Sequence, residues 1–104
     1  MDEIEAEGLA AALATEPPAV LDVRENWEVA LCSIPGSRHI PLGELTQRLD
    51  ELDRDRRLVV VCHHGVRSRA AQAYLLAQGF RHVENLAGGI DAWARRIDPT
   101  MAVY

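Results

Sequence analysis

The sequence predicts a three-layer α/β domain, in which a parallel sheet of four or five short strands carries helices on both faces. Segments of strand-like and helix-like sequence alternate along the chain, as they do where crossover helices connect parallel strands. Residues 58–61 are apolar at every position, whereas a strand with one face in water would alternate apolar and polar side chains. The 104 residues suffice for one core, so we expect a single domain over residues 1–104.

Five segments are candidates for the strands. Residues 20–23 and 58–61 are runs rich in valine and leucine, and the β-branched valines favour strands. Residues 83–86 form a weaker third candidate. The remaining two candidates are an edge strand at residues 38–40 and a very short strand at Ile4. Strands of this length, joined by helices, fit within the chain.

Helical patterns lie between these strands. Residues 5–14 are rich in Ala, Glu and Leu, and the leucines of residues 42–52 recur at helical spacing. The strongest pattern covers residues 67–78, and a last helix is expected over residues 90–96. The apolar stripe that we expect on the strongest helix consists of Ala70, Ala73, Tyr74 and Ala77.

Composition and charge exclude several classes of function. The chain is 48% hydrophobic and 26% charged, which is ordinary for a globular protein and unlike a disordered tail. No apolar run approaches the ~20 residues of a membrane span, and the acidic N-terminus lacks the regions of a signal peptide. We therefore expect a cytoplasmic protein without a membrane partner. The formal net charge of −5 argues against nucleic acid as the main partner.

The loop after the apolar strand carries the candidate chemistry. Ligands of open α/β sheets bind at the carboxyl ends of strands, and free loop amides at a helix N-terminus converge on anions. These amides, the helix dipole and an arginine all favour a thiolate at Cys62. The alternative is a small apolar residue that ends a core strand. The candidate catalytic residue is Cys62, and the candidate binding residues are His63, His64, Gly65, Val66, Arg67 and Ser68.

The spacing within this loop separates two chemistries. Four residues lie between Cys62 and Arg67, whereas cysteine-dependent phosphatases use the pattern C-x5-R, one residue longer. A shorter loop makes a smaller ring of amides, which suits a thiolate bearing one extra sulfur atom better than a tetrahedral phosphate. A cysteine phosphatase or an arsenate reductase remains the alternative class of enzyme.

At this point the chain resembles the single-domain rhodaneses, the thiosulfate sulfurtransferase-like proteins, from about residue 4 onwards. The resemblance rests on four stretches that occur in order, namely residues 21–25, 34–42, 62–68 and 85–93, the last with Gly-Gly-x-x-x-Trp. It implies that Cys62 takes a sulfane sulfur from a donor, becomes a persulfide and passes the sulfur on.

The resemblance also implies the classes of partner. The donor would be thiosulfate or a persulfide, and the acceptor would be cyanide in an assay and a thiol or protein in cells. Neither a metal nor an organic cofactor is implied. Because Arg67 is the loop's only arginine, a persulfide on a protein or small thiol is favoured over the thiosulfate dianion. A non-enzymatic module that carries a persulfide to one partner protein is the alternative function.

Other residues near the motifs have competing interpretations. His63 and His64 are either rim residues that shape access or polar side chains that point to water. Cys32 stands where the family commonly has glycine, and a resolving role against Cys62 would need Cα atoms within ~7 Å. We expect Cys32 to be a plain substitution.

The remaining candidates are expected to be structural. Asp22 and Arg24 lie at the carboxyl end of a strand and are expected to form a structural ion pair or a loop hydrogen bond, with a role in the cleft as the alternative. Trp93 is expected to pack in the core. Trp27 is also expected to pack, with a place at the mouth of the cleft as the alternative.

Overall fold

The sheet of the computed structural model, which describes residues 2–104, is parallel throughout. Its strand order is β1-β5-β4-β2-β3, and every neighbouring pair runs parallel. The predicted α/β fold class is therefore confirmed, with five strands. The strands are β1 (Glu3–Ile4), β2 (Ala19–Asp22), β3 (Arg38–His39), β4 (Leu58–Val61) and β5 (Val83–Leu86).

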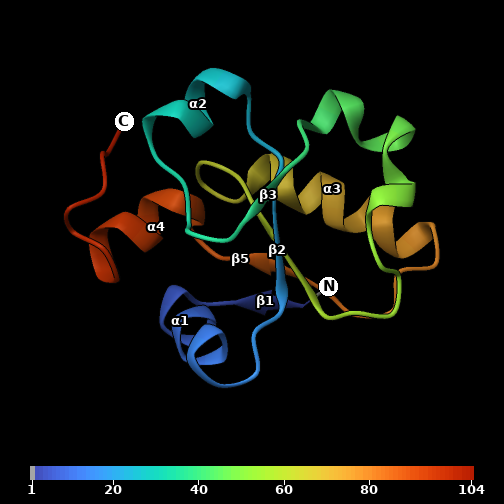
Figure 1. Ribbon diagram of the computed structural model, residues 1–104, viewed down its shortest axis with the longest axis horizontal. Helices are drawn as coiled ribbons and strands as arrows, with labels where there is room; N and C mark the ends of the chain where they lie inside the picture. The colour runs from blue at the N-terminus through green and yellow to red at the C-terminus, as the bar shows by residue number, and fades with distance from the viewer. Residues whose placement is uncertain (1) are drawn as a thin grey trace.

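Helices cover both faces of this sheet (Figure 1). One face carries α1 (Ala6–Thr15) and α4 (Gly89–Arg96), and the other carries α3 (Val66–Ala77). The short helix α2 (Asn26–Leu31) follows β2. The leucine-rich segment, for which we expected helical structure, forms two 3-10 helices, η1 (Leu42–Gln47) and η2 (Leu49–Glu51), and η1 packs beside α3.

The position of β4 at the centre of the sheet accounts for its uninterrupted apolar sequence. All four of its residues are buried, because the strand has neighbours on both sides and helices on both faces. Val59 and Val61 join the core cluster under α1 and α4. Leu58 and Val60, together with Cys62, join the cluster under α3. Successive side chains point to opposite faces, so a strand covered on both faces needs an uninterrupted apolar run.

The buried face of α3 differs from the expected alanine stripe. Three of the four stripe residues, Ala70, Ala73 and Ala77, are exposed. The inward face combines core packing by Ala71 and Leu75 with hydrogen bonds of buried polar side chains, whereas a stripe of alanines would bury little apolar area. Gln72, for example, donates to the backbone oxygen of Val83 at 3.0 Å. The buried residues of α3 are Ser68, Ala71, Gln72 and Leu75.

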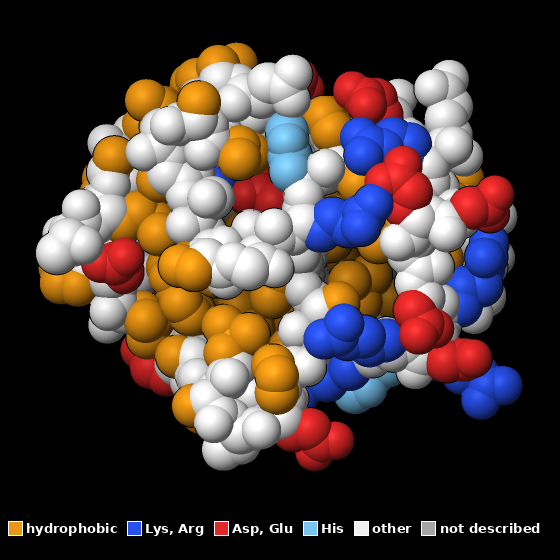
Figure 2. Space-filling model, in the orientation of Figure 1, with side chains coloured by type: hydrophobic (Ala, Val, Ile, Leu, Met, Phe, Trp, Pro, Cys, Tyr) orange, Lys and Arg blue, Asp and Glu red, His pale blue; other side chains and the backbone are white. Residues whose placement is uncertain are grey.

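Charged side chains of the surface are largely paired. On the face shown in Figure 2, arginines and carboxylates lie interspersed rather than in one broad basic area. Arg38 pairs with Glu51, and Arg48 lies 2.7 Å from the same carboxylate. Among residues 2–104, no helix is long and apolar enough to cross a membrane.

Candidate active site

Cys62 directly follows β4, so the strand delivers its sulfur to the carboxyl end of the sheet. The residue is 1% exposed, and its Sγ accepts a hydrogen bond from the N–H of Gly65 at 3.0 Å. The hydroxyl oxygen of Ser68 lies 3.3 Å from the same sulfur. Gly65 lets the chain turn back because its φ of +105° lies in the left-handed region. Two donors on one sulfur stabilise negative charge there.

Ser68 is shared between Cys62 and Asn85, whose Oδ1 lies 2.5 Å from the hydroxyl oxygen. A serine hydroxyl has one hydrogen, so it donates to one of these partners at a time. Both acceptors lie within reach of the hydroxyl, so it can hydrogen-bond to either Asn85 or the sulfur. The amide nitrogen of Asn85 donates to the backbone oxygen of Gly65 at 3.1 Å, which fixes the side chain. Sequence reasoning assigned Asn85 no role, because this contact depends on the strand order.

The N-terminus of α4 holds the loop from the side opposite the sulfur. The N–H of Ile90 donates to the carbonyl oxygen of Cys62 at 2.8 Å, and the N–H of Asp91 to that of His63 at 3.1 Å. Gly89 makes this approach feasible, because a Cβ there would lie 2.4 Å from the carbonyl oxygen of His63. With these carbonyls bound by α4, the N–H of Gly65 is directed at the sulfur.

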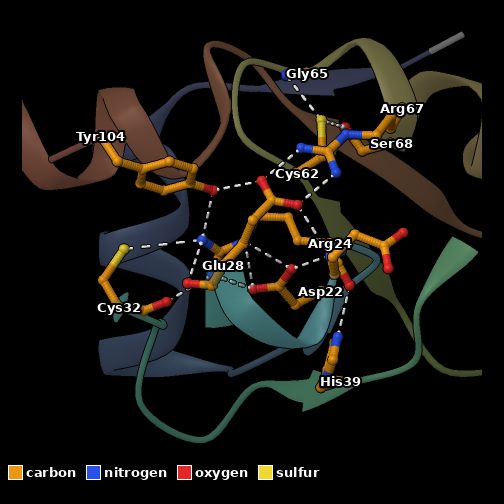
Figure 3. Close-up of polar contacts among 11 residues, drawn as sticks. Asp22, Arg24, Glu28, Cys32, His39, Cys62, Gly65, Arg67, Ser68 and Tyr104 are labelled. Atoms are coloured by element: carbon orange, nitrogen blue, oxygen red, sulfur yellow. Dashed lines mark hydrogen bonds and ion pairs between the residues drawn. The ribbon is translucent and has the colours of Figure 1, made fainter. Parts of the chain in front are cut away.

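Arg67, the arginine of the loop, is paired with a buried carboxylate from α2 (Figure 3). Its two terminal nitrogens donate to the two oxygens of Glu28 at 2.6 and 2.8 Å. The side chain of Glu28 is 3% exposed, and the Arg67 guanidinium lowers the pKa of that carboxyl to about 2. Arg67 therefore meets a full negative charge at neutral pH. Sequence reasoning missed Glu28, since no motif links the two residues.

Tyr104 contacts both the loop and this ion pair, and the sequence gives no signal for it. Its hydroxyl donates to Glu28 Oε2 at 2.7 Å and accepts from Arg24 Nη1 at 2.9 Å. Its ring stacks on His63, with centroids 3.9 Å apart and planes 6° from parallel. His63 in turn stacks on His64 at 3.9 Å. Burial raises the pKa of Tyr104 to about 12, together with the hydrogen bond to Glu28, so the hydroxyl is protonated at neutral pH.

Comparison with known proteins identifies the family of the chain. The profile of the Rhodanese-like domain family matches residues 5–96. The chain belongs to this family. A protein named sulfurtransferase from Allochromatium vinosum is 41% identical over 103 residues, 98% of this chain and 96% of the relative. A protein named thiosulfate sulfurtransferase GlpE from Pseudomonas fluorescens is 40% identical over 84 residues, 81% of this chain and 77% of the relative.

A solved structure agrees with these relatives. The crystal structure of a rhodanese-related protein from Thermoplasma volcanium matches with a TM-score of 0.86 at 35% identity, over 93% of this chain and 94% of that chain. This rhodanese-like domain is therefore a sulfurtransferase of the rhodanese type. The resemblance inferred from the four sequence stretches is confirmed.

The ion pair expected between Asp22 and Arg24 is present and buried in this rhodanese-like domain. Arg24 Nη2 lies 2.7 Å from Asp22 Oδ2, and the two side chains are 0% and 2% exposed. Arg24 also donates to the backbone oxygen of Cys32 at 2.7 Å and to Tyr104. Arg24 therefore ties the end of β2 to the end of α2 and to residue 104, which is a structural role.

The two cysteines of the rhodanese-like domain are both free thiols and lie apart. Cys62 belongs to the core cluster on the α3 face of the sheet, whereas Cys32 packs against the cluster on the other face. Cys32 Sγ lies 3.8 Å from Arg24 Nη1. In Figure 3 the side chains of Glu28 and Arg24 lie between the two sulfurs.

The aromatic and histidine residues divide between core and rim. Trp93 is buried at 6% exposure, as expected. The prediction that Trp27 packs is wrong: it is 63% exposed, and its ring meets the ring of Tyr104 edge-on at a centroid distance of 5.9 Å. His63 is half-buried against Tyr104, and His64 is exposed.

A groove of about 500 Å³ adjoins the loop and lies between His64 and the first turns of α3. Val66, which is 80% exposed, lines this groove. Arg69 and Glu3 also line it and form an ion pair, with Arg69 Nη2 2.8 Å from Glu3 Oε2. Within residues 2–104, no three His, Cys, Asp or Glu side chains gather in the way a metal site requires.

Proposed function

We propose that the chain transfers sulfane sulfur through a persulfide on Cys62. The thiolate attacks the outer sulfur of the donor, the donor's S–S bond breaks, and the donor leaves with the electron pair as sulfite or as a thiolate. A nucleophilic acceptor then attacks the terminal sulfur and releases the Cys62 thiolate, so no net oxidation occurs. The observation that carries the proposal is the Cys62 sulfur at the end of β4, which the Gly65 N–H and the Ser68 hydroxyl both contact.

The other loop residues have distinct roles in this proposal. The N–H of Gly65 and the hydroxyl of Ser68 stabilise charge on the sulfur in both half-reactions. Arg67 fixes the end of the loop through Glu28. His63, His64 and Val66 form the rim that donor and acceptor meet.

The charge of the site favours one class of donor. Arg67 is the loop's only arginine, and Glu28 neutralises it. A dianion such as thiosulfate would therefore gain little from this side chain. We infer that a persulfide on a small thiol or protein is the better donor, with thiosulfate also accepted. Two free thiols agree with the reducing cytoplasmic location that we propose.

Intact mass tests the persulfide directly. Treatment with thiosulfate or with glutathione persulfide should add about 32 Da, one sulfur atom, and cyanide should remove it. Cys62→Ser should take up no sulfur, whereas the control Cys32→Ser should load like the wild type. Loading and transfer by Cys62→Ser would refute the mechanism.

Two further measurements separate the alternatives. Repeated turnover with a small acceptor distinguishes an enzyme from a module that carries sulfur to one partner. Turnover of an aryl phosphate that depends on Cys62 would instead reverse our ranking of sulfur transfer over phosphoryl transfer.

A further inference from the structure

We propose that Tyr104 is a positioning residue for sulfur transfer, which holds both ends of the Cys62 loop through one side chain. The inference rests on the function proposed above. It concerns a residue 42 positions beyond Cys62 in the sequence, in a segment that follows α4. Three sets of contacts carry it.

The first set fixes the start of the loop. The Tyr104 ring lies parallel to that of His63, the residue next to Cys62, at a centroid distance of 3.9 Å. His63 Nε2 lies 2.8 Å from the main-chain oxygen of Tyr104. An oxygen of this kind only accepts, so Nε2 carries the hydrogen. Stacking and hydrogen bond together give the His63 ring one orientation.

The second set fixes the end of the loop. Both oxygens of Glu28 are bound to Arg67, and Oε2 also accepts the hydroxyl hydrogen of Tyr104 at 2.7 Å. The Tyr104 hydroxyl thus restrains the carboxylate from the side opposite the loop. Because Arg67 lies in the first turn of the helix that follows the loop, a shift of Glu28 would be passed to the amides around Cys62.

The third set anchors Tyr104 itself. Its hydroxyl oxygen accepts a hydrogen bond from Arg24, which is 0% exposed and bound to Asp22. A buried arginine held by a carboxylate has one conformation, so it provides a fixed point. The raised pKa of Tyr104, about 12, keeps the hydroxyl a donor to Glu28 throughout the range in which thiols are assayed.

Substitution of Tyr104 separates the two contacts. Tyr104→Phe keeps the ring stacked on His63 and removes the hydroxyl with its two hydrogen bonds, to Glu28 and from Arg24. It should slow sulfur loading of Cys62 about fivefold, the average worth of the one bond that restrains Glu28. Tyr104→Ala removes the stacking as well as the hydroxyl, keeps the main-chain oxygen that His63 binds, and should slow loading more than about tenfold. Tyr74→Phe is the matched control, because Tyr74 is the chain's other tyrosine and lies half-buried on α3. It should load at the wild-type rate.

The rate of Cys62 alkylation against pH, resolved by peptide mapping, is the second measurement. It needs no sulfur donor, so it reports on the loop even if the chain does not transfer sulfur. A change in this profile for Tyr104→Phe, with a melting temperature close to that of Tyr74→Phe, supports a positioning role. An unchanged profile and loading rate, in a wild type that loads sulfur, would overturn the inference and leave the proposed function standing.

A double-mutant cycle tests the route through Glu28. In Glu28→Gln the negative charge is lost and one acceptor oxygen becomes an NH2 group, which cannot accept from Arg67, so holding residue 28 in place matters less. The factor by which Tyr104→Phe slows sulfur loading should therefore be smaller in the Glu28→Gln background than in the wild type. If the double variant slows loading by the product of the two single-variant factors, the hydroxyl does not act through Glu28 and this part of the inference is wrong.

Discussion

Cys32 and Cys62 are both thiols, but their surroundings give them different chemistry. Cys62 ends a buried strand, and its sulfur has a backbone N–H and a hydroxyl as neighbours. Cys32 lies at the end of α2, where its backbone oxygen binds Arg24 and its sulfur has only a long contact to the same side chain. Burial alone does not distinguish a reactive thiol from an inert one, whereas the donors around the sulfur do.

This contrast predicts that Cys32→Ser leaves sulfur transfer within about twofold of the wild type, since the Cys32 sulfur contacts Arg24 and packs on the face of the sheet away from Cys62. Peptide mapping of sulfur-loaded protein after mild oxidation should show no Cys32–Cys62 disulfide, because the two side chains pack toward opposite faces of the sheet. A disulfide in the wild type, with a persulfide that persists only in Cys32→Ser, would give Cys32 the resolving role.

At the scale of elements, the loop depends on the start of α4. The helix donates two N–H groups to loop carbonyls, and the close approach leaves no room for a side chain at Gly89. Gly89 of the Gly-Gly pair therefore supports the active-site loop, through the carbonyl oxygens of Cys62 and His63.

We expect Gly89→Ala to lower the free energy of unfolding by at least about 2 kcal/mol and to abolish sulfur loading. Its Cβ would meet carbonyl oxygens of Cys62 and His63 at 2.5 and 2.4 Å. Gly79→Ala is the control, because Gly79 also has positive φ, +90°, but nothing lies within 4 Å of its Cβ. Urea denaturation and intact mass measure both effects. If Gly89→Ala lowers the free energy of unfolding no more than Gly79→Ala does, the close approach of residue 89 to the loop carbonyls does not exclude a side chain there.

The elements also show what the sequence could predict. The strands and the loop after β4 were predictable, because β-branched runs and a glycine turn are local signals. The inward face of α3 was not, because hydrogen bonds from Ser68 and Gln72 to distant residues set it. Glu28 and Tyr104 reach the site only through the tertiary fold, so no spacing within the chain indicates them.

At the scale of the whole molecule, the ion pair of Glu28 links stability to pH. The folded state lowers the pKa of Glu28 from 4.5 to about 2, so between these values the unfolded chain binds the extra proton. Stability from this pair is therefore complete above the unfolded pKa and is lost as the pH falls toward the folded one.

Glu28→Gln should consequently have a lower free energy of unfolding than the wild type by about 2 kcal/mol at neutral pH. The gap should narrow between about pH 5 and about pH 3, as urea denaturation at several pH values would show. Glu51→Gln is the control: the pKa of Glu51 is also lowered to about 2, chiefly by Arg48, but its pairs are exposed. Salt should weaken the effect of Glu51→Gln more than that of Glu28→Gln. A difference in the free energy of unfolding between Glu28→Gln and the wild type that stays the same at every pH would contradict the lowered pKa of Glu28.

The strand order β5-β4-β2 brings three separate chain segments to one edge of the sheet. The loop after β4 carries the nucleophile, α4 after β5 binds its carbonyls, and α2 after β2 supplies the carboxylate for its arginine. A protein engineer who grafted residues 62–68 alone onto another α/β scaffold would transplant a sequence without the hydrogen bonds that give it a shape. The unit that can be transferred is the carboxyl end of strands β5, β4 and β2 with the segments that follow them, and a successful graft would have to move all three segments together.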